Sequence, residues 1–578
     1  MNRYALKWII GLTTLCISVH ALAKTSISFN ISGIKDPALD NATKRLEILA
    51  KGDKKITAVT ARKLYAEGAT NIKHAIQPYG FFKATVSQRG LRRKNGNWVA
   101  KFAVNPGEPL RITKVKLEVT GPGKNDKKIQ HVLKKDEEKK IKVGEIFNVP
   151  AYQKERDKLL FEAQKRGYIK AKMTVDKIKI NLITYTCQIT IIMDTNARYY
   201  FGTTTFEKSP LNKSFLHRFI HYKRGKPFSS DKLLALQSSL GGAGYFKGAS
   251  VTPLLDNIKN YTVPVHVNLT PNKRKLYEIG LGYGTVSGPR MTAGINWRWT
   301  NAYGHYFKTN MMISKIDQNI QAQYIIPAKH PATDQYVLSA GIFTLQPGRG
   351  TAFVKKIGVG YQSQRGRWKR NLNLSYILER YRIDKSQPTR NANMLAPSLA
   401  YEWTSVTNII RVKNGSRLAL LMQGSWKPII SSVTFLQGEA RFKTIQTFFK
   451  NNRIILRTDI GYTLVKDSDR LPLSVRFYTG GPSSIRGYAD QGIGPGRYLT
   501  VYSAEYQRRI VGDFYGAVFY DLGNAFKSYD NYFSNLQRGA GIGAVWQTML
   551  GDVSVYVAKA LSKKGHPIRF MFSLGAEL

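Results

Sequence analysis

The second half of the chain, from about Pro271 onward, consists of short segments in which polar and apolar residues alternate, separated by Gly-, Asn- and Lys-rich connections. Successive side chains of a strand point to opposite faces, so each segment has two different faces. The segment 456–464 shows this: one face holds Leu456, Thr458, Ile460, Tyr462 and Leu464, and the other holds Arg457, Asp459, Gly461 and Thr463. Beyond the leader no segment has the continuous apolar run of a membrane helix. Any part that spans a membrane is therefore expected to be a closed β-barrel, in which every strand has neighbours on both sides.

The alternating region extends over residues 271–578. Spanning strands need roughly 9 to 11 residues plus connections, so about 14 to 18 of them fit there. We expect sixteen. The alternative is a soluble β-sandwich, but that fold does not usually carry so many aromatic residues on the face that a membrane interface favours. The expected fold class is α+β repeats followed by a transmembrane antiparallel β-barrel.

The first residues predict an exported protein. Arg3 and Lys7 form a positive start, an apolar stretch follows, and Ala21-Leu22-Ala23 is a small-residue cleavage site, so residues 1–23 are expected to be a signal peptide. After cleavage only Cys187 remains, and the mature protein cannot form an internal disulfide.

The net charge of +52, from 89 Lys and Arg against 37 Asp and Glu, would ordinarily suggest nucleic-acid binding. Export argues against nucleic acid as a partner, and the chain contains no recognisable nucleic-acid module. A generally basic composition is the simple explanation, and attraction to anionic lipid head groups or acidic clients is a second one.

One short pattern occurs three times in the first half. Each copy follows a helix-like segment and precedes two strand-like runs, so its Gly suits a left-handed helix stop and its aromatic residue can fold back onto the helix. The copies are Tyr79-Gly80-Phe81-Phe82-Lys83-Ala84, Arg166-Gly167-Tyr168-Ile169-Lys170-Ala171 and Ala243-Gly244-Tyr245-Phe246-Lys247-Gly248. The repeating unit is a helix, a glycine-aromatic turn and a strand pair.

That unit, with a leading strand and a first helix, resembles the polypeptide-transport-associated (POTRA) domain. The resemblance implies three POTRA domains, at residues 24–104, 105–195 and 196–270, followed by an outer-membrane barrel at 271–578. It places the protein in the bacterial outer membrane with its N-terminal domains in the periplasm.

Two motifs of the second half resemble those of outer-membrane assembly factors of the BamA/TamA-like family. The segment Gly480-Gly481-Pro482-Ser483-Ser484-Ile485-Arg486-Gly487-Tyr488 is similar to the Val/Ile-Arg-Gly-Phe/Tyr signature of the sixth extracellular loop of these proteins and of two-partner secretion translocators. The segment Phe519-Tyr520-Asp521-Leu522-Gly523 fits the Phe-x-Asp-x-Gly strand motif of the family.

The residues of these motifs predict a loop anchor. Period two puts Phe519, Asp521 and Gly523 on one face of their strand, so Asp521 is expected to point into the lumen. A carboxylate there needs a partner, and a guanidinium can offer it two parallel hydrogen bonds. We expect Arg486, in the Arg486-Gly487-Tyr488 motif, to pair with Asp521 and Glu505 and to hold the loop inside the barrel. The alternative is a solvated arginine in a glycine-rich hairpin.

In such barrels the first and last strands close by an imperfect seam. The expected first strand, 276–284, contains Gly280, Gly282 and Gly284, which weaken strand pairing, and the expected last strand is 568–578. Unpaired edges are templates for strand addition, so the 276–284 edge is expected to open toward lipid and to assist insertion or translocation of client β-proteins. The seam residues of the last strand are Phe570, Phe572, Gly575 and Leu578.

Within the family the chain is most similar to the translocation and assembly module branch, through its length, its three repeats, and stretches such as Trp297–His305 and Tyr324–Pro327. This resemblance implies client outer-membrane β-proteins such as autotransporters, and a TamB-like, inner-membrane-anchored partner near the first repeat. The alternative is a two-partner-secretion pore that passes clients through the lumen. No enzyme motif or metal-ligand spacing is present, so no catalysis, cofactor or metal is expected.

Overall fold

The computed structural model describes residues 26–51, 56–134, 141–284, 288–406, 410–449, 451–528, 535–549 and 551–575. The expected signal peptide lies outside these residues. Among them, no helix has both the length and the apolar character that crossing a membrane requires. The chain forms two compact units, and the division between them passes through the third of three small sheets.

The first small sheet packs two helices on one face. Its core contains Leu46 and Ile72 from the helices and Phe102 from the central strand, all almost completely buried. The first strand pairs in parallel with the third, giving the order β1-β3-β2. The elements are β1 (Ile27–Ser32), α2 (Ala38–Ala50), α3 (Ala58–Ile76), η1 (Gln77–Tyr79), β2 (Thr85–Lys94) and β3 (Asn97–Asn105).

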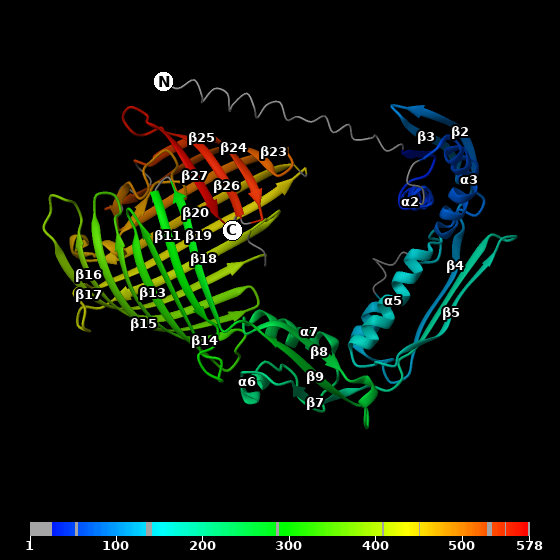
Figure 1. Ribbon diagram of the computed structural model, residues 1–578, viewed down its shortest axis with the longest axis horizontal. Helices are drawn as coiled ribbons and strands as arrows, with labels where there is room; N and C mark the ends of the chain where they lie inside the picture. Colours follow the sequence, from blue (N-terminus) through cyan, green and yellow to red (C-terminus); the bar gives the residue numbers. More distant parts are fainter. Residues whose placement is uncertain are drawn as a thin grey trace, which may run out of the picture. The chain divides into compact units, whose positions relative to one another are not determined.

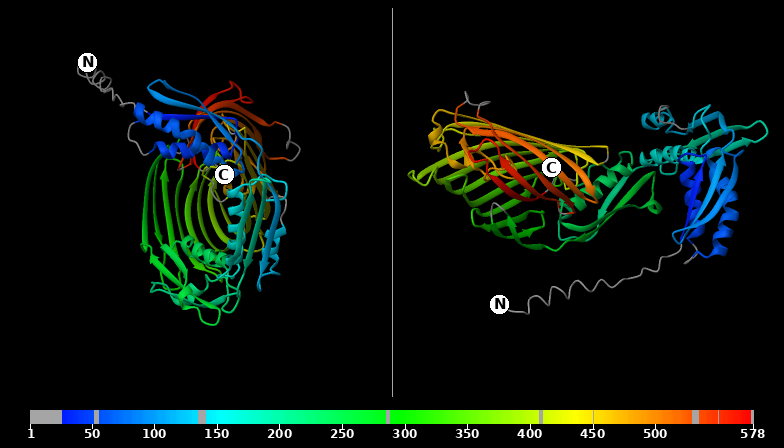
Figure 2. Two further views of the ribbon diagram at one scale, coloured as in Figure 1. Left: turned by 90° about the vertical axis from the view of Figure 1, so that its right-hand side faces the viewer. Right: turned by 90° about the horizontal axis from the view of Figure 1, so that it is seen from above.

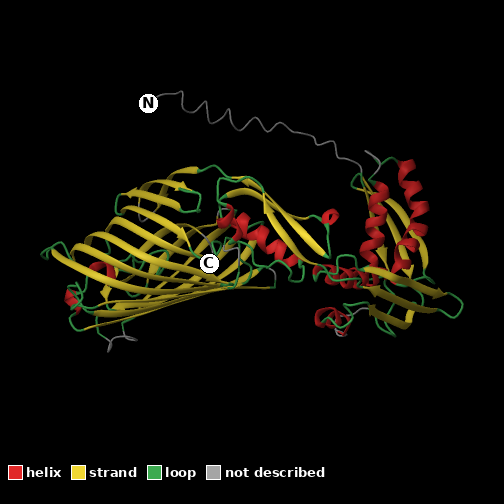
Figure 3. Ribbon diagram, turned by 90° about the horizontal axis from the view of Figure 1, so that it is seen from below, coloured by secondary structure: helices red, strands yellow, loops and turns green. Residues whose placement is uncertain are grey.

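The next two small sheets repeat this plan, with strand orders β4-β6-β5 and β7-β9-β8. Figure 3 shows the helices of the chain gathered mainly beside these small sheets. The second contains β4 (Arg111–Thr120), α4 (Lys127–Lys134), α5 (Val149–Lys165), β5 (Lys172–Asn181) and β6 (Thr186–Asp194). The third contains β7 (Tyr200–Phe206), α6 (Lys213–His217), α7 (Ser230–Gly242), β8 (Phe246–Pro253), η3 (Leu255–Asn257) and β9 (Thr262–Pro271).

The three glycine-aromatic turns have the predicted left-handed geometry. Gly80, Gly167 and Gly244 have φ of +90°, +96° and +80°. The aromatic residues after the second and third of them, Tyr168 and Tyr245, are buried. The predicted helix stop is therefore confirmed in all three copies, since these φ values favour glycine. The domain boundaries at 104, 195 and 270 remain predictions.

The second half of the chain forms one antiparallel sheet of sixteen strands, the number expected, in simple chain order from β10 to β27 (Figures 1 and 2). The strands are β10 (Lys275–Gly284), β11 (Gly288–Trp297), β12 (Tyr306–Ser314), β13 (Gln318–Pro327), β14 (Asp334–Leu345), β15 (Thr351–Arg365), β16 (Trp368–Arg382), β17 (Arg390–Thr404), β18 (Gly415–Ser425), β19 (Phe435–Phe448), β20 (Asn452–Val465), β23 (Tyr498–Val511), β24 (Phe514–Phe526), β25 (Gln537–Thr548), β26 (Gly551–Ala560) and β27 (Ile568–Gly575).

A long loop joins β20 to β23 and contains four short elements: η4 (Ser468–Arg470), η5 (Leu473–Val475), β21 (Phe477–Thr479) and β22 (Ile493–Gly496). Alternation of strand direction puts this loop at the opposite end of the barrel from the β11–β12 turn.

The β11–β12 turn is the place where the third small sheet contacts the barrel. The Tyr245 hydroxyl donates to the carbonyl oxygen of Gly304 at 2.6 Å. The Phe215 ring packs so closely on Gly304 that a Cβ there would lie 2.3 Å from the ring. Arg218 donates to the Pro327 carbonyl at 2.9 Å and to that of Ala328 in the next turn of this end. The end of the barrel that receives the third repeat is thus defined by direct contacts.

Candidate functional site

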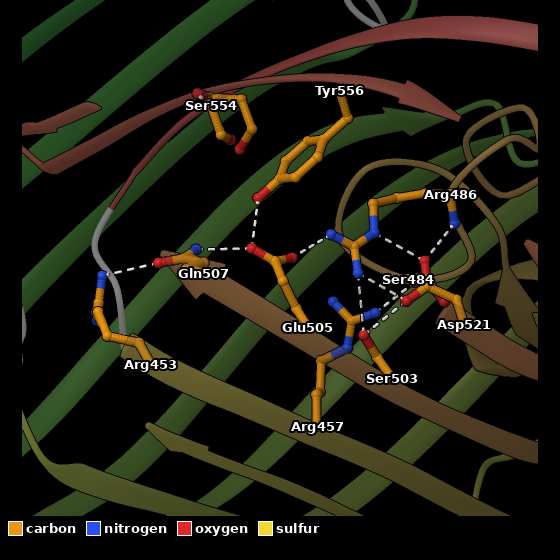
Figure 4. Close-up of polar contacts among 11 residues, drawn as sticks. Arg453, Arg457, Ser484, Arg486, Ser503, Glu505, Gln507, Asp521, Ser554 and Tyr556 are labelled. Atoms are coloured by element: carbon orange, nitrogen blue, oxygen red, sulfur yellow. Dashed lines mark hydrogen bonds and ion pairs between the residues drawn. The ribbon is translucent and has the colours of Figure 1, made fainter. Parts of the chain in front are cut away.

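Arg486 lies inside the barrel and binds Asp521 through two parallel hydrogen bonds. Its Nε donates to Oδ2 and its Nη2 to Oδ1, each at 2.8 Å, and its backbone N–H also donates to Oδ2 at 2.9 Å (Figure 4). Arg486 is 4% exposed and Asp521 is fully buried. Two buried opposite charges with this geometry satisfy each other's hydrogen-bonding groups, which burial of either charge alone would not.

Glu505 on β23 is the second carboxylate of the cluster. It accepts from Arg486 Nη1, from the Tyr556 hydroxyl at 2.9 Å and from Gln507 Nε2 at 2.7 Å. Gln507 in turn accepts from Arg453 Nη1 at 2.9 Å (Figure 4). The network therefore joins the loop to strands β20, β23, β24 and β26.

The alternation of β24 positions the carboxylate. Phe519, Asp521 and Gly523 are buried on the inner face, whereas Val518 and Tyr520 are exposed on the outer face. Ser503, opposite Asp521 on β23, donates to Asp521 Oδ1 at 2.6 Å. The structure thus brings together the charged residues that the sequence predicted as partners.

Glycines allow the loop to lie against the wall. Gly487 has φ of +93°, and a Cβ there would lie 2.8 Å from the backbone of Lys559 and Ala560 on β26. On β25, a Cβ at Gly539 would lie 2.0 Å from the Arg486 carbonyl oxygen. The Tyr488 hydroxyl donates to the Arg538 carbonyl at 3.2 Å. Close backbone approach on both sides of Arg486 therefore requires glycine.

Sequence reasoning missed Tyr556, Arg453 and Gly539. Tyr556 alternates with outward residues on β26, so its inward direction could have been read from the period. Its contact with Glu505 could not have been predicted in this way, because 51 residues separate the two in the sequence.

The strands β10 and β27 are the two ends of the sheet order, and between their described residues no pairing joins them. β10 pairs with β11 along its full length. Its outward residues Tyr277, Ile279 and Leu281 are 63%, 78% and 84% exposed. The alternating positions Gly280 and Gly282 carry no side chain, and Gly284 ends the strand.

The strand at the other end of the sheet, β27, contacts the inner wall through a buried side chain. Phe570 and Phe572 point outward from β27, whereas Met571 points inward and packs in a buried cluster with Phe519 and Tyr556. Gly575 is the last described residue of this strand, and Leu578 lies outside the described residues. The expected last strand therefore has its described end at Gly575.

Residues 301–578 match the Omp85 superfamily domain, and residues 28–106 match POTRA domain TamA domain 1. The outer membrane protein assembly factor BamA of Nitratidesulfovibrio vulgaris is 21% identical over 540 residues, which cover 86% of this chain and 66% of that protein. The chain thus spans just under two thirds of that relative's length. The crystal structure of BamA from Haemophilus ducreyi lacking POTRA domains 1-3 is similar with a TM-score of 0.65 at 18% identity, over 81% of this chain and 99% of that chain. These findings identify an Omp85 superfamily barrel with POTRA domains: the chain is an outer-membrane β-barrel protein whose POTRA domains are periplasmic.

Proposed function

We propose that this protein is an assembly and translocation factor, which assists the insertion or secretion of client β-barrel proteins such as autotransporters through the seam between β10 and β27. The observation that carries the proposal is that the two ends of the sixteen-stranded sheet do not pair through their described residues. A strand edge with free N–H and C=O groups is a template for an incoming strand.

The two edges suggest which strand moves. Met571 ties β27 to a buried cluster on the inner wall. The inward positions 280 and 282 of β10 are glycines, so this part of the strand has little to hold it from inside. We infer that the seam opens by movement of β10 away from β27, while β27 stays with the wall.

The loop-anchoring network is proposed to keep the wall next to β27 in shape. Its members are Arg486, Gly487, Tyr488, Glu505, Phe519, Asp521 and Gly523. They connect the loop to β23, β24 and β26, the last of which pairs with β27. A firm wall on that side would let an opening movement be confined to β10.

The proposed partner is an inner-membrane-anchored, TamB-like protein that contacts the first POTRA domain. The match of residues 28–106 to POTRA domain TamA domain 1 supports this branch of the family. The curated relative is named as an assembly factor, which supports client outer-membrane proteins as substrates.

A seam lock tests the proposal. In a Cys187→Ala background, Ile279→Cys is combined with Phe570→Cys or Phe572→Cys and cross-linked with thiol reagents of stepped length. Client insertion should stop and should return on reduction. The control is Ala293→Cys with Met311→Cys, which joins two strands that already pair.

Full activity of the locked protein would show that client insertion does not require opening of the seam between β10 and β27. If clients then cross-link to a lumen position, such as Gln321→Cys, the route is through the pore, as in the two-partner-secretion alternative.

A further inference from the structure

The segment 468–476 of the long loop contacts the inner wall on the other side of β20 from Arg486. Glu379 on β16 is 2% exposed and accepts two hydrogen bonds from Ser474. The Ser474 backbone N–H donates to Oε1 at 3.1 Å and its hydroxyl donates to Oε2. Both oxygens of a buried carboxylate are thus occupied by one loop residue.

Two further polar contacts hold the same segment. Gln437 on β19 is 3% exposed, and its Nε2 donates to the carbonyl oxygen of Val475 at 2.7 Å and to Thr463 Oγ1 at 2.8 Å. Arg390 on β17 donates to the carbonyl oxygen of Asp469 at 2.6 Å. Together with Glu379 on β16, these partners lie on three strands, so the segment is attached across a broad part of the wall.

Apolar burial accompanies the polar contacts. Leu473 is 1% exposed and packs with Val354 and Tyr381, while Leu471 and Val475 pack in a second cluster with Met394. An extracellular loop that only folded back over the rim would not bury three aliphatic side chains among inward-facing wall residues. The segment therefore forms part of the packed interior of the barrel.

We propose that Glu379 and Ser474 form a second anchor of the long loop, which holds segment 468–476 over the lumen and narrows its extracellular end independently of Arg486. Arg486 attaches the loop to β23 and β24, and Glu379 attaches it on the other side of β20. Attached on both sides of β20, the loop spans part of the lumen, and loss of the Glu379–Ser474 contact weakens its attachment on the side that Arg486 does not hold. This inference extends the proposed function to control of the lumen, but its test does not depend on client insertion.

The test is single-channel conductance of the purified full-length protein in planar lipid bilayers. Glu379→Ala should raise the mean conductance about twofold or more, because the segment is then held less firmly and narrows the passage less. Ser474→Ala changes no charge and should raise it in the same direction to a smaller extent. Glu402→Ala is the matched control, since it removes an equal lumenal charge that pairs with Arg417 instead.

Thiol labelling gives a second measurement. Leu473→Cys, in a Cys187→Ala background, should react with a membrane-impermeant maleimide faster when Glu379→Ala is added and no faster when Glu402→Ala is added. Barrel folding is checked by heat-modifiable mobility in gels for every variant.

If folded Glu379→Ala and Ser474→Ala proteins keep the conductance and labelling of their controls, the second anchor is wrong. Loss of client insertion with unchanged conductance contradicts the anchor as well. If the seam-locked protein keeps full activity and Glu379→Ala still changes the conductance, the proposed function is overturned and the anchor stands.

Discussion

The guanidinium carbon of Arg486 lies 3.5 Å from the centroid of the Phe519 ring, and Phe519 precedes Asp521 by two positions on the inner face of β24. The Tyr556 ring lies 4.9 Å from the same carbon. One strand thus presents an aromatic face and a carboxylate to a single buried cation. Because few water molecules reach this site, the ring contributes electrostatic attraction as well as packing.

Replacement of Phe519 by Leu should lower the free energy of unfolding by about 1 to 3 kcal/mol, since it removes the ring under the cation and keeps most of the apolar volume. Urea unfolding in lipid vesicles measures the change. Tyr520→Leu, at the exposed neighbouring position, is the control and should change it by less than about 0.5 kcal/mol. Equal effects of the two changes would show that the ring does not act on Arg486.

Removal of the cation should lower the free energy of unfolding more than removal of the ring does. Arg486→Ala leaves two buried carboxylates without their partner, and about 3 to 5 kcal/mol of unfolding free energy should be lost. Adding Asp521→Asn should restore part of the loss, because one of the two unpaired buried charges is then removed. Arg470→Ala is the control in the same loop, and this exposed pair with Asp467 should contribute at most about 1 kcal/mol. An additive double mutant would contradict direct coupling of Arg486 and Asp521.

Comparing two glycines with positive φ distinguishes the effect of backbone strain from the effect of a closely packed neighbouring strand. Gly487 and Gly565 have φ of +93° and +78°, but a Cβ would meet the β26 backbone only at Gly487. Gly565→Ala should cost about 1 to 2 kcal/mol from the left-handed conformation alone. Gly487→Ala should cost clearly more, as seen in the urea midpoint. Similar midpoints for the two variants would mean that the loop can move away from β26.

The contact between Tyr245 and Gly304 should stabilise the junction of the third repeat with the barrel. Tyr245→Phe removes a buried hydrogen bond and should cost about 0.5 to 1.5 kcal/mol. Hydrogen exchange of the turn 298–305 should become faster. Tyr303→Phe alters an exposed tyrosine of the same turn and should leave the exchange unchanged. Unchanged exchange in Tyr245→Phe would show that the junction does not depend on this bond.

Burial raises the pKa of the Cys187 thiol from its ordinary 9.0 to about 11. The folded protein therefore holds the thiol proton more tightly than the unfolded chain does. The resulting contribution to stability is complete below pH 9 and declines as the pH rises from 9 to about 11. Native protein at pH 8 should resist alkylation, and Cys187→Ala should show a smaller fall in stability over that range. Rapid alkylation of the native protein would contradict the assignment.

Local patterns predicted much of the candidate site. The alternation around Asp521 determines which residues face the lumen, and the glycine-rich loop carries in Arg486 a guanidinium that can pair with an inward carboxylate. The pairing of Glu379 with Ser474 was not predicted, because 95 residues separate them and neither stands in a distinctive motif. Contacts of this kind depend on the path of the loop across the lumen.

The sequence by itself determined the period-two faces, the three left-handed glycine stops and the class of fold, because each of these follows from sterics and polarity within a few neighbouring residues. Only the tertiary structure decided that the described residues of β10 and β27 do not pair and that the long loop is attached a second time, at Glu379. These depend on register and loop path, which many weak contacts far apart in the chain establish together.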